Sequence, residues 1–332
     1  MCYAIPARVI KIEERFATVE YFGQKRKVLK DLLDFDIGDY VYVQAGMAIR
    51  KIPHLQAQSI LKTWKVLFSK LKNQDESLIN KSYSGLRLSK PYDAIIKKID
   101  EKRRLSVTDY LYLLNGVSSD EGKFSQQLAN RIRNKYIDNS CCIHGIIEIS
   151  NYCVRDCLYC GIRKSNKKLK RYRLKLNQIL EAVDYAVNSR GFKVLVLQAG
   201  EDAYYTKARV LEIIRKIRQK YAVLIFLSLG ERSESDYQAF FDAGVRGALL
   251  RFESANPKIY SALRPEKKLE DRLKLIKSLK NIGYLVATGF LVGLPNETDT
   301  DILNNIKLTK KLKPEMYSFG PLIPHLDTPL AS

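Results

Sequence analysis

The sequence has little cysteine outside one short stretch, no long hydrophobic run and no leader-like start. Five of its six cysteines fall between residues 141 and 160, which argues against a disulfide framework spread over a small secreted fold. The longest largely apolar run, Tyr221–Leu229, has nine residues; a bilayer span needs about 20. The N-terminus lacks the charged start and long apolar core of a signal peptide. We therefore expect a cytoplasmic protein that does not enter the membrane.

Acidic residues are outnumbered: 57 Lys+Arg face 36 Asp+Glu, for a net charge of +21. Residues 1–75 carry a net charge of +5 and the remaining residues +16, so the charge per residue is similar and no basic tail exists. A lysine-rich solvated surface therefore explains the basicity better than a nucleic-acid footprint. The exception is Arg163–Lys175, with eight basic and no acidic residues. For this stretch a solvated loop and a docking site for an acidic electron donor both remain open.

The first 74 residues predict a small all-β domain. Short alternating segments separated by turn residues such as Gly23 and Gly38 indicate about five strands, as in a small OB-like barrel. Apolar residues at helical spacing over 54–72 then predict a C-terminal helix. The polar residues 75–91 resemble a linker, and 92–332 form a second domain that begins with a helical lead-in over 92–140.

The second domain alternates strand and helix. Six apolar runs separated by amphipathic stretches occur at 146–149, 193–198, 222–229, 247–252, 284–292 and 316–319. Strands joined by helices predict a parallel sheet with right-handed crossovers. A closed eight-stranded barrel needs about two more units. We therefore expect an α/β fold with a partial (β/α)6-type TIM-like barrel behind the small β-barrel.

Three cysteines in the loop 151–175 give the most specific signal. Cys153, Cys157 and Cys160, at spacings of four and three, follow the first predicted barrel strand. A structural zinc site needs four protein ligands, and an electron-transfer [4Fe–4S] cluster also takes four thiolates. Three thiolates leave one coordination position open, as a catalytic cluster requires. A zinc site that recruits Cys141, Cys142 or His144 is the alternative.

This loop resembles the CxxxCxxC loop of the radical S-adenosylmethionine (SAM) enzymes. The resemblance implies a [4Fe–4S] cluster whose unique iron binds SAM, and a reduced cluster that breaks a C–S bond to give methionine and a 5′-deoxyadenosyl radical. It also implies which residues contact SAM at the ends of successive strands: Tyr159 in the cysteine loop, then Ala199, Gly200 and Glu201, then Glu231, Arg251, Gly289 and Gly293. A structural ion pair is the alternative for each charged residue taken alone.

The finer resemblance is to HydE, the [FeFe]-hydrogenase maturase, with relatives in biotin synthase and the methylornithine-forming enzyme. It is carried by QAGED, SLGER, VGLPNET and GPLIPHLDTPL, together with the cysteine loop, and covers 92–331. Ala199 stands where a Ser is usual and Phe252 where a His is common, and the last two barrel strands of that family lie outside the sequence. The resemblance therefore implies SAM cleavage more strongly than it implies a substrate.

The N-terminal residues MCYAIPARV resemble the HypC/HupF hydrogenase-assembly chaperones, as does IGDYVYVQAGMAI further on, with Gln44 where a His is common. In that family the second residue is a Cys that carries an iron fragment. If Met1 is removed, Cys2 has its ammonium beside its thiol, which favours the thiolate and metal binding. The alternative for Cys2 is a buried cysteine at a strand end.

Together these resemblances imply a radical SAM enzyme of hydrogenase metallocentre assembly, with Cys2 as the iron-fragment ligand. A reductant such as ferredoxin or flavodoxin is expected as a partner, with hydrogenase maturation proteins or a hydrogenase subunit. A radical SAM enzyme of cofactor or amino-acid metabolism, and a non-catalytic cluster-binding scaffold, remain alternatives. Cys141 and Cys142 have no assigned role.

Overall fold

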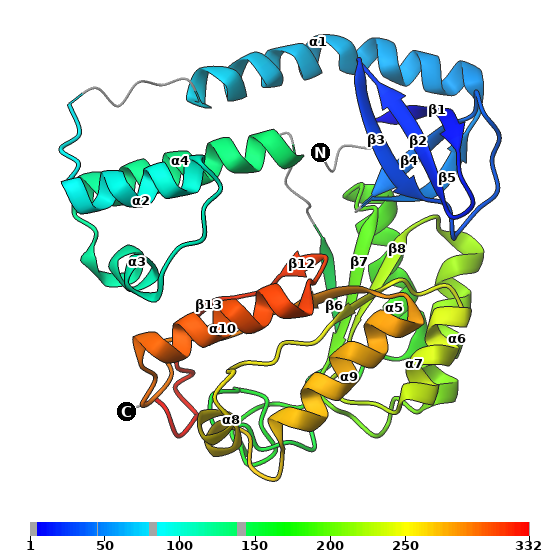
Figure 1. Cartoon of the computed structure of the whole chain (residues 1–332). Helices are drawn as coiled ribbons and strands as arrows, with labels where there is room; N and C mark the ends of the chain where they lie inside the picture. Colours follow the sequence, from blue (N-terminus) through cyan, green and yellow to red (C-terminus); the bar gives the residue numbers. More distant parts are fainter. Residues whose placement is uncertain (1–4, 45, 80–84, 138–143, 332) are drawn as a thin grey trace. The chain divides into compact units, whose positions relative to one another are not determined.

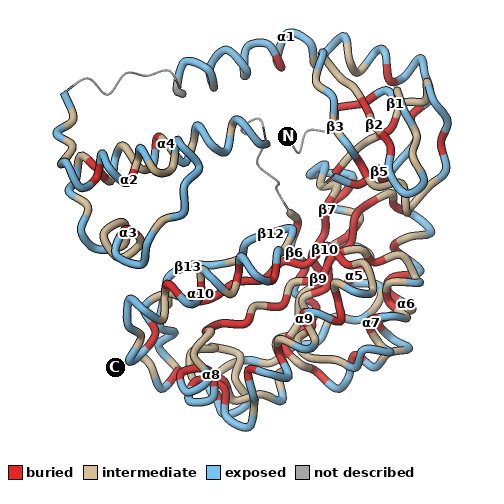
Figure 2. The backbone as a smooth tube through the Cα atoms, in the orientation of Figure 1, coloured by how far each residue is buried: buried red, intermediate tan, exposed pale blue. Residues whose placement is uncertain are grey.

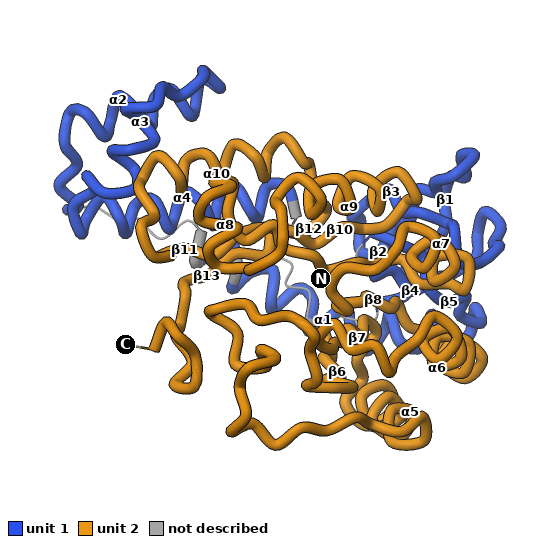
Figure 3. Tube along the Cα trace, turned by 90° about the horizontal axis from the view of Figure 1, so that it is seen from below, with its two compact units in different colours: residues 1–142 blue, residues 143–332 orange. Residues whose placement is uncertain are grey.

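The computed structural model describes residues 5–44, 46–79, 85–137 and 144–331. Contacts divide the chain into two compact units, residues 1–142 and 143–332, which Figure 3 colours separately. None of the helices in the described ranges combines the length and apolar character that crossing a membrane requires.

The first unit contains the predicted small β-barrel. Its five strands close in the order β1-β2-β3-β5-β4. They are β1 (Pro6–Ile12), β2 (Phe16–Tyr21), β3 (Gln24–Leu29), β4 (Tyr40–Gln44) and β5 (Met47–Ile52). Their alternating side chains pack inward as a core that includes Val9, Val19, Val28 and Val41. The prediction of a small all-β barrel is therefore confirmed.

The turn between β2 and β3 shows how local sequence sets the register of the barrel. Tyr21 pairs with Gln24, so the loop has two residues. Phe22 has φ 48° and Gly23 φ 78°. Two successive positive φ values match the right-handed twist of the flanking strands, and glycine adopts the second without steric cost.

Helix α1 (His54–Ile79) follows the barrel and is longer than predicted. The sequence indicated a helix over 54–72 and a linker from residue 75, but 75–79 are helical. Lys, Gln and Glu are good helix formers, so an exposed polar stretch can continue a helix without an apolar stripe. Residues 80–84 of the expected linker lie outside the described ranges.

The helical lead-in comprises α2 (Lys90–Asp100), α3 (Val107–Leu111), the π-helical turn η1 (Tyr112–Gly116) and α4 (Ser119–Ile137). By contacts these helices belong to the first unit, whereas the sequence grouped them with the second domain. Glu121, 1% exposed, joins them. Its carboxylate accepts hydrogen bonds from Ser89 Oγ at 2.6 Å and from the Ser118 amide at 2.7 Å. These hydrogen bonds lower the pKa of Glu121 from 4.5 to about 2.

Replacing Glu121 by glutamine should weaken this joint. The variant loses one acceptor, so either the Ser89 or the Ser118 amide loses its partner. Because the folded-state pKa lies below the ordinary value, the stabilisation by Glu121 is complete above about pH 4.5 and is lost as the pH falls toward 2. Hydrogen-exchange protection factors of these two amides should therefore differ between wild type and variant at pH 6 and converge near pH 2. Glu101→Gln, an exposed control, should show no such convergence.

The second unit contains a six-stranded sheet in the order β12-β10-β9-β8-β7-β6, with every pairing parallel. The strands are β6 (Gly145–Ser150), β7 (Val194–Ala199), β8 (Leu224–Ser228), β9 (Gly247–Leu249), β10 (Leu285–Thr288) and β12 (Met316–Tyr317). A short second sheet pairs β11 (Leu291–Val292) with β13 (Gly320–Pro321). The sheet is open, with β6 and β12 at its edges. The expected partial barrel is therefore confirmed.

Helices connect these strands in turn (Figure 1). They are α5 (Leu176–Asp184) with the π-helical turn η2 (Tyr185–Ser189), α6 (Lys207–Lys220), α7 (Glu234–Asp242), α8 (Pro257–Leu263), α9 (Leu269–Ile282) and α10 (Asp299–Leu312). The strands between them are mostly buried (Figure 2), and the core is continuous from Ile147 to Leu312. Packing is tightest at Gly247, where an added Cβ would lie 2.2 Å from the Phe226 ring.

Candidate cluster and cofactor site at the carboxyl ends of the strands

The three predicted cluster ligands lie in the loop between β6 and α5. Cys153, Cys157 and Cys160 are all free thiols; Cys157 is buried and the other two are half-buried. The Cys160 amide donates to the Cys157 carbonyl at 3.2 Å, so the loop turns tightly between them. Burial raises the pKa of the Cys157 and Cys160 thiols. Metal binding would therefore have to displace protons, as is usual for thiolate ligands.

The cysteine loop is fixed to the ends of neighbouring elements. The Val154 amide donates to the Glu201 carbonyl just beyond β7, at 3.0 Å, and the Leu158 amide donates to the Leu263 carbonyl at the end of α8, at 2.9 Å. A Cβ on Gly200 would lie 2.2 Å from the Tyr152 carbonyl oxygen and 2.7 Å from Cys153 Cβ. Position 200 therefore requires glycine, because any side chain there would displace the loop.

The zinc alternative loses one of its ligands. His144 directly precedes β6, whereas the cysteine loop follows this strand, and six residues of strand separate the two by about 20 Å. Burial lowers the pKa of His144, which packs against Phe226. Cys141 and Cys142 lie outside the described residues. No group of three or more His, Cys, Asp or Glu in the described ranges could hold a metal ion. An iron–sulfur cluster does not need such convergence, because each thiolate binds a different iron.

An ion-pair network joins the cysteine loop to the ends of β7 and β8. Glu201 lies 2.5 Å from Arg155 Nε in the loop and 3.6 Å from Arg264 Nη2. Glu231, after β8, lies 2.6 Å from Lys267 Nζ and 2.9 Å from Arg272 Nε. Burial opposes the ionised form of Glu231, but the positive charges of Arg272, Lys267 and Arg264 outweigh it and lower its pKa. Both glutamates are therefore held as carboxylates.

Arg264 is the centre of this network, although the sequence did not identify it as a site residue. It is 5% exposed and contacts both carboxylates, lying 3.8 Å from Glu231. Its Nε is shielded from solvent and has no hydrogen-bond partner. Burial opposes its charge, but Tyr159 and Cys157 are among the groups that raise its pKa, which places this cation beside the cysteine loop. The signal that could have identified it is the arginine in YSALRP, after α8.

The end of β9 contributes a second pair. Arg251 Nε lies 3.4 Å from Glu253 Oε2, and the hydroxyl of Tyr159 donates to Glu253 Oε1 at 3.2 Å. Glu253 is 7% exposed and adopts φ 64°, a left-handed conformation that is costly for a glutamate. Its Oε2 is buried without a hydrogen-bond partner. Burial, followed by the charge of Glu253, raises the pKa of Tyr159 well above its ordinary value.

The two glycines after β10 have different surroundings. A Cβ on Gly289 would lie 2.2 Å from the Ser318 carbonyl oxygen, so its close approach is to the backbone of this chain, whereas the resemblance implied an approach to adenine. Gly293 has φ 83° with open space around it, so a turn explains this glycine. Ala199 ends β7 beside Gly200.

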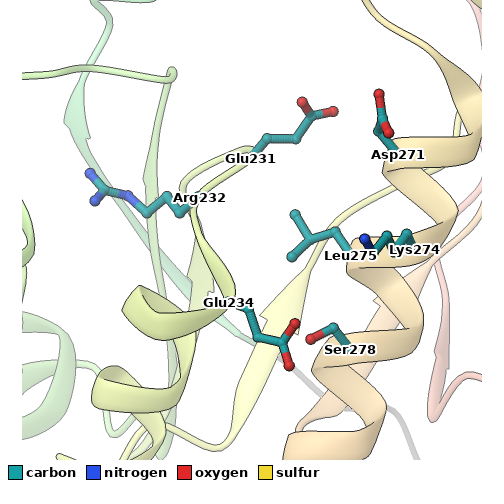
Figure 4. A pocket seen from close by; sticks show the side chains of 7 residues that line it. All are labelled: Glu231, Arg232, Glu234, Asp271, Lys274, Leu275 and Ser278. Atoms are coloured by element: carbon teal, nitrogen blue, oxygen red, sulfur yellow. The ribbon is translucent and has the colours of Figure 1, made fainter.

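A cavity of about 270 Å³ lies beside Glu231, between the start of α7 and one side of α9 (Figure 4). Its lining residues are Glu231, Arg232, Glu234, Asp271, Lys274, Leu275 and Ser278. Figure 4 shows the guanidinium of Arg232 directed away from α9. The cavity contains none of the three cysteines, so it is separate from the cluster loop.

The structure thus brings Cys153, Cys157 and Cys160 together with Glu201, Glu231 and Glu253 at one end of the sheet. The orphaned Nε of Arg264 and Oε2 of Glu253 are buried polar atoms that a polar ligand at this end could satisfy. A bound cluster with a zwitterionic cofactor fits this donor set. Cys2 lies outside the described residues, and the structure does not place it.

Comparison with known families divides the chain in the same way as its fold. Residues 1–64 match the HupF/HypC family and residues 147–309 match the Radical SAM superfamily. Over 206 residues the chain is 43% identical to the [FeFe] hydrogenase maturase subunit HydE of Thermotoga maritima, a match that covers 62% of this chain and 59% of that protein. It is 27% identical over 240 residues to 3-methylornithine synthase of Methanosarcina acetivorans, covering 72% and 68%.

Solved structures share the fold. Methylornithine synthase (PylB) superimposes with a TM-score of 0.66 at 24% identity, covering 72% of this chain and 70% of that one. The FeFe-hydrogenase maturase HydG of Carboxydothermus hydrogenoformans superimposes with a TM-score of 0.62 at 22% identity, covering 79% and 63%. At these identities the likeness establishes the TIM-like fold alone.

Proposed function

Because residues 147–309 belong to the radical SAM superfamily and residues 1–64 to the HupF/HypC family, we propose that this chain cleaves SAM reductively in the assembly of a hydrogenase metal centre. The observation that carries the proposal is the loop of three free cysteines, fixed at the ends of β6 and β7 by Gly200 and the Glu201 carbonyl. Three thiolates leave the fourth iron of a cluster without a protein ligand.

The superfamily's cofactors are a [4Fe–4S] cluster and SAM, and the cluster supplies the electron that breaks a C–S bond of SAM. Cys153, Cys157 and Cys160 would hold the cluster. The remaining strand-end residues bind and orient: the free Nε of Arg264 can donate to a carboxylate, and Glu253 Oε2 can accept from an ammonium group. Arg251 lies beside Glu253 and is available for the same carboxylate.

Apolar side chains beside the cysteine loop keep water out. Tyr159 packs against a buried cluster formed by Ile259, Leu263, Leu291 and Leu294. Exclusion of water strengthens the ion pairs at Arg264 and protects a reactive radical from side reactions.

The biological setting rests on both domains. The relative HydE is named as an [FeFe] hydrogenase maturase, and this chain spans 59% of its length. We propose a small molecule or an iron complex as the substrate, and hydrogenase maturation proteins or a hydrogenase subunit as partners. A tether between the two domains can raise the effective concentration of one near the other to about the mM range. Free thiols and a reducible cluster suit the reducing cytoplasm, which we propose as the location.

The test is reductive cleavage by the reconstituted chain. With iron and sulfide bound anaerobically and dithionite as reductant, we expect methionine and 5′-deoxyadenosine to form in equal amounts. Mössbauer spectra should contain one iron site that changes when SAM is added. A cluster that binds without any cleavage of SAM would instead identify a scaffold, and stoichiometric zinc in place of iron would exclude both readings.

Cys2 is proposed as the ligand that presents or receives the iron fragment. Cys2→Ser should therefore reduce iron transfer to the partner to background, because a neutral hydroxyl is a poor ligand for a borderline metal. The measurement is ⁵⁷Fe passed from the loaded chain to an acceptor protein. Transfer at the wild-type rate by the variant would remove Cys2 from the mechanism and leave SAM cleavage unaffected.

A further inference from the structure

The stretch Arg163–Lys175, called here the basic loop, has a charge that the SAM chemistry does not use. We propose that the basic loop is the docking surface for an acidic one-electron carrier protein that reduces the cluster. This inference rests on the proposed function, because it presumes a cluster on the cysteine loop.

The three arginines of the basic loop have structural roles. Arg163 Nε lies 2.8 Å from Asp156, and Arg173 forms two hydrogen bonds to Asp202 at 2.8 and 2.9 Å. The guanidinium of Arg171 donates to the carbonyls of Ile162 and Arg163 at 2.9 and 2.6 Å. These contacts hold the loop in one conformation, so a partner that binds it pays little ordering entropy.

The lysines extend outward. Lys164, Lys167, Lys168, Lys170 and Lys175 are all exposed. Lys168 Nζ lies 3.4 Å from Asp327 and so is partly compensated. Long, flexible, strongly hydrated ammonium groups suit a transient contact that is steered by charge, because they attract carboxylates over a distance without being fixed in a single geometry.

The basic loop folds back onto the cysteine loop. The Lys164 amide donates to the Arg155 carbonyl, between Cys153 and Cys157, at 2.7 Å. The side-chain amide of Asn151, two residues before Cys153, donates to the Lys170 carbonyl at 2.9 Å. The Asn166 side chain, next to Lys167, donates to the Gly161 carbonyl at 2.8 Å. A carrier bound to these lysines therefore lies beside the loop that holds the cluster ligands.

The chemistry of the site selects the class of partner. One electron leaves the reduced carrier and enters the oxidised cluster, so the carrier is oxidised by one electron and the cluster reduced by one, with no bond made or broken. A surface of lysines complements the carboxylates of an acidic carrier. A single-stranded nucleic acid would in addition require several exposed aromatic side chains for base stacking. The basic loop has one aromatic residue, Tyr172, and its hydroxyl donates to the Glu148 carbonyl.

The test compares two triple variants of the full chain that change the net charge equally. Lys164→Glu, Lys167→Glu and Lys170→Glu reverse the charge of the basic loop and leave its arginines in place. Lys216→Glu, Lys277→Glu and Lys307→Glu reverse three exposed lysines within α6, α9 and α10. Each protein is reconstituted, and the rate of 5′-deoxyadenosine formation is measured once with reduced flavodoxin and once with dithionite.

We expect the basic-loop variant to lose about tenfold or more of its flavodoxin-driven rate at low salt. Its dithionite-driven rate should stay within about twofold of wild type, as should both rates of the control variant. Added salt should slow the wild type with flavodoxin and leave the basic-loop variant nearly unchanged. An equal fall with both reductants, or no fall with flavodoxin, would overturn the inference.

Failure of the proposed function has a different signature. If the wild type forms no 5′-deoxyadenosine even with dithionite, SAM cleavage is excluded, but titration calorimetry with flavodoxin still decides the docking surface. Binding that the basic-loop variant loses and the control retains supports the surface. Binding retained by both variants, or tighter binding of a single-stranded oligonucleotide than of flavodoxin to the wild type, overturns it.

Discussion

Replacement of Cys157 by serine is expected to remove the iron–sulfur cluster and with it all reductive cleavage of SAM. Cys157 is the buried member of the three cysteines, and the next residue is fixed by the hydrogen bond from the Leu158 amide to the Leu263 carbonyl. A serine hydroxyl would occupy the same place but would not ionise to a soft anionic ligand. Two remaining thiolates hold a four-iron cluster poorly.

Cys2→Ser is the matched control, because it makes the same chemical change in the HupF/HypC domain. Iron and sulfide content, visible absorbance and 5′-deoxyadenosine formation should fall to background in Cys157→Ser and remain at wild-type levels in Cys2→Ser. Far-UV circular dichroism should be the same for both apo proteins. A full complement of iron in the Cys157 variant would mean that the cluster ligands are different residues.

The parts of this molecule that follow from local sequence were predictable. Alternation of apolar residues identified the strands of the small barrel, and six apolar runs identified the strands of the parallel sheet. The spacing of Cys153, Cys157 and Cys160 identified the candidate cluster loop, because its ligands lie within eight residues of one another. Such features depend on neighbours in the chain, which a single sequence displays directly.

Features that depend on long-range contacts were not predictable in this way. Arg264 meets Glu201 and Glu231 across separations of 63 and 33 residues, and no local pattern announces either pair. The extension of α1 to Ile79 was missed because polar residues suit both a linker and an exposed helix. Gly289 was assigned to a ligand contact, but only the fold reveals that the Ser318 backbone lies against it.

Replacement of Arg264 by leucine should cost about 3–5 kcal/mol of the free energy of unfolding of the second unit, because it leaves two buried carboxylates without this cation. Leucine fills part of the volume but cannot compensate charge. Glu231 retains Lys267 and Arg272, and Glu201 retains Arg155, so the loss should be smaller than for two fully unpaired ions. Urea unfolding followed by circular dichroism measures it.

Arg215→Leu, at an exposed position of α6, is the control and should change the free energy of unfolding by no more than about 0.5 kcal/mol. Adding Glu231→Gln to Arg264→Leu should restore part of the lost stability, because it removes one of the carboxylates that Arg264 neutralised. The sign of the pH effect follows from the lowered pKa of Glu231: its ion pairs stabilise the fold above the ordinary pKa of 4.5 and are lost as the pH falls. Wild type should therefore lose more stability than Arg264→Leu on acidification, and the two should approach each other. A constant difference between them from pH 7 to pH 4 would show that Arg264 stabilises the site by packing alone, without compensating Glu201 or Glu231.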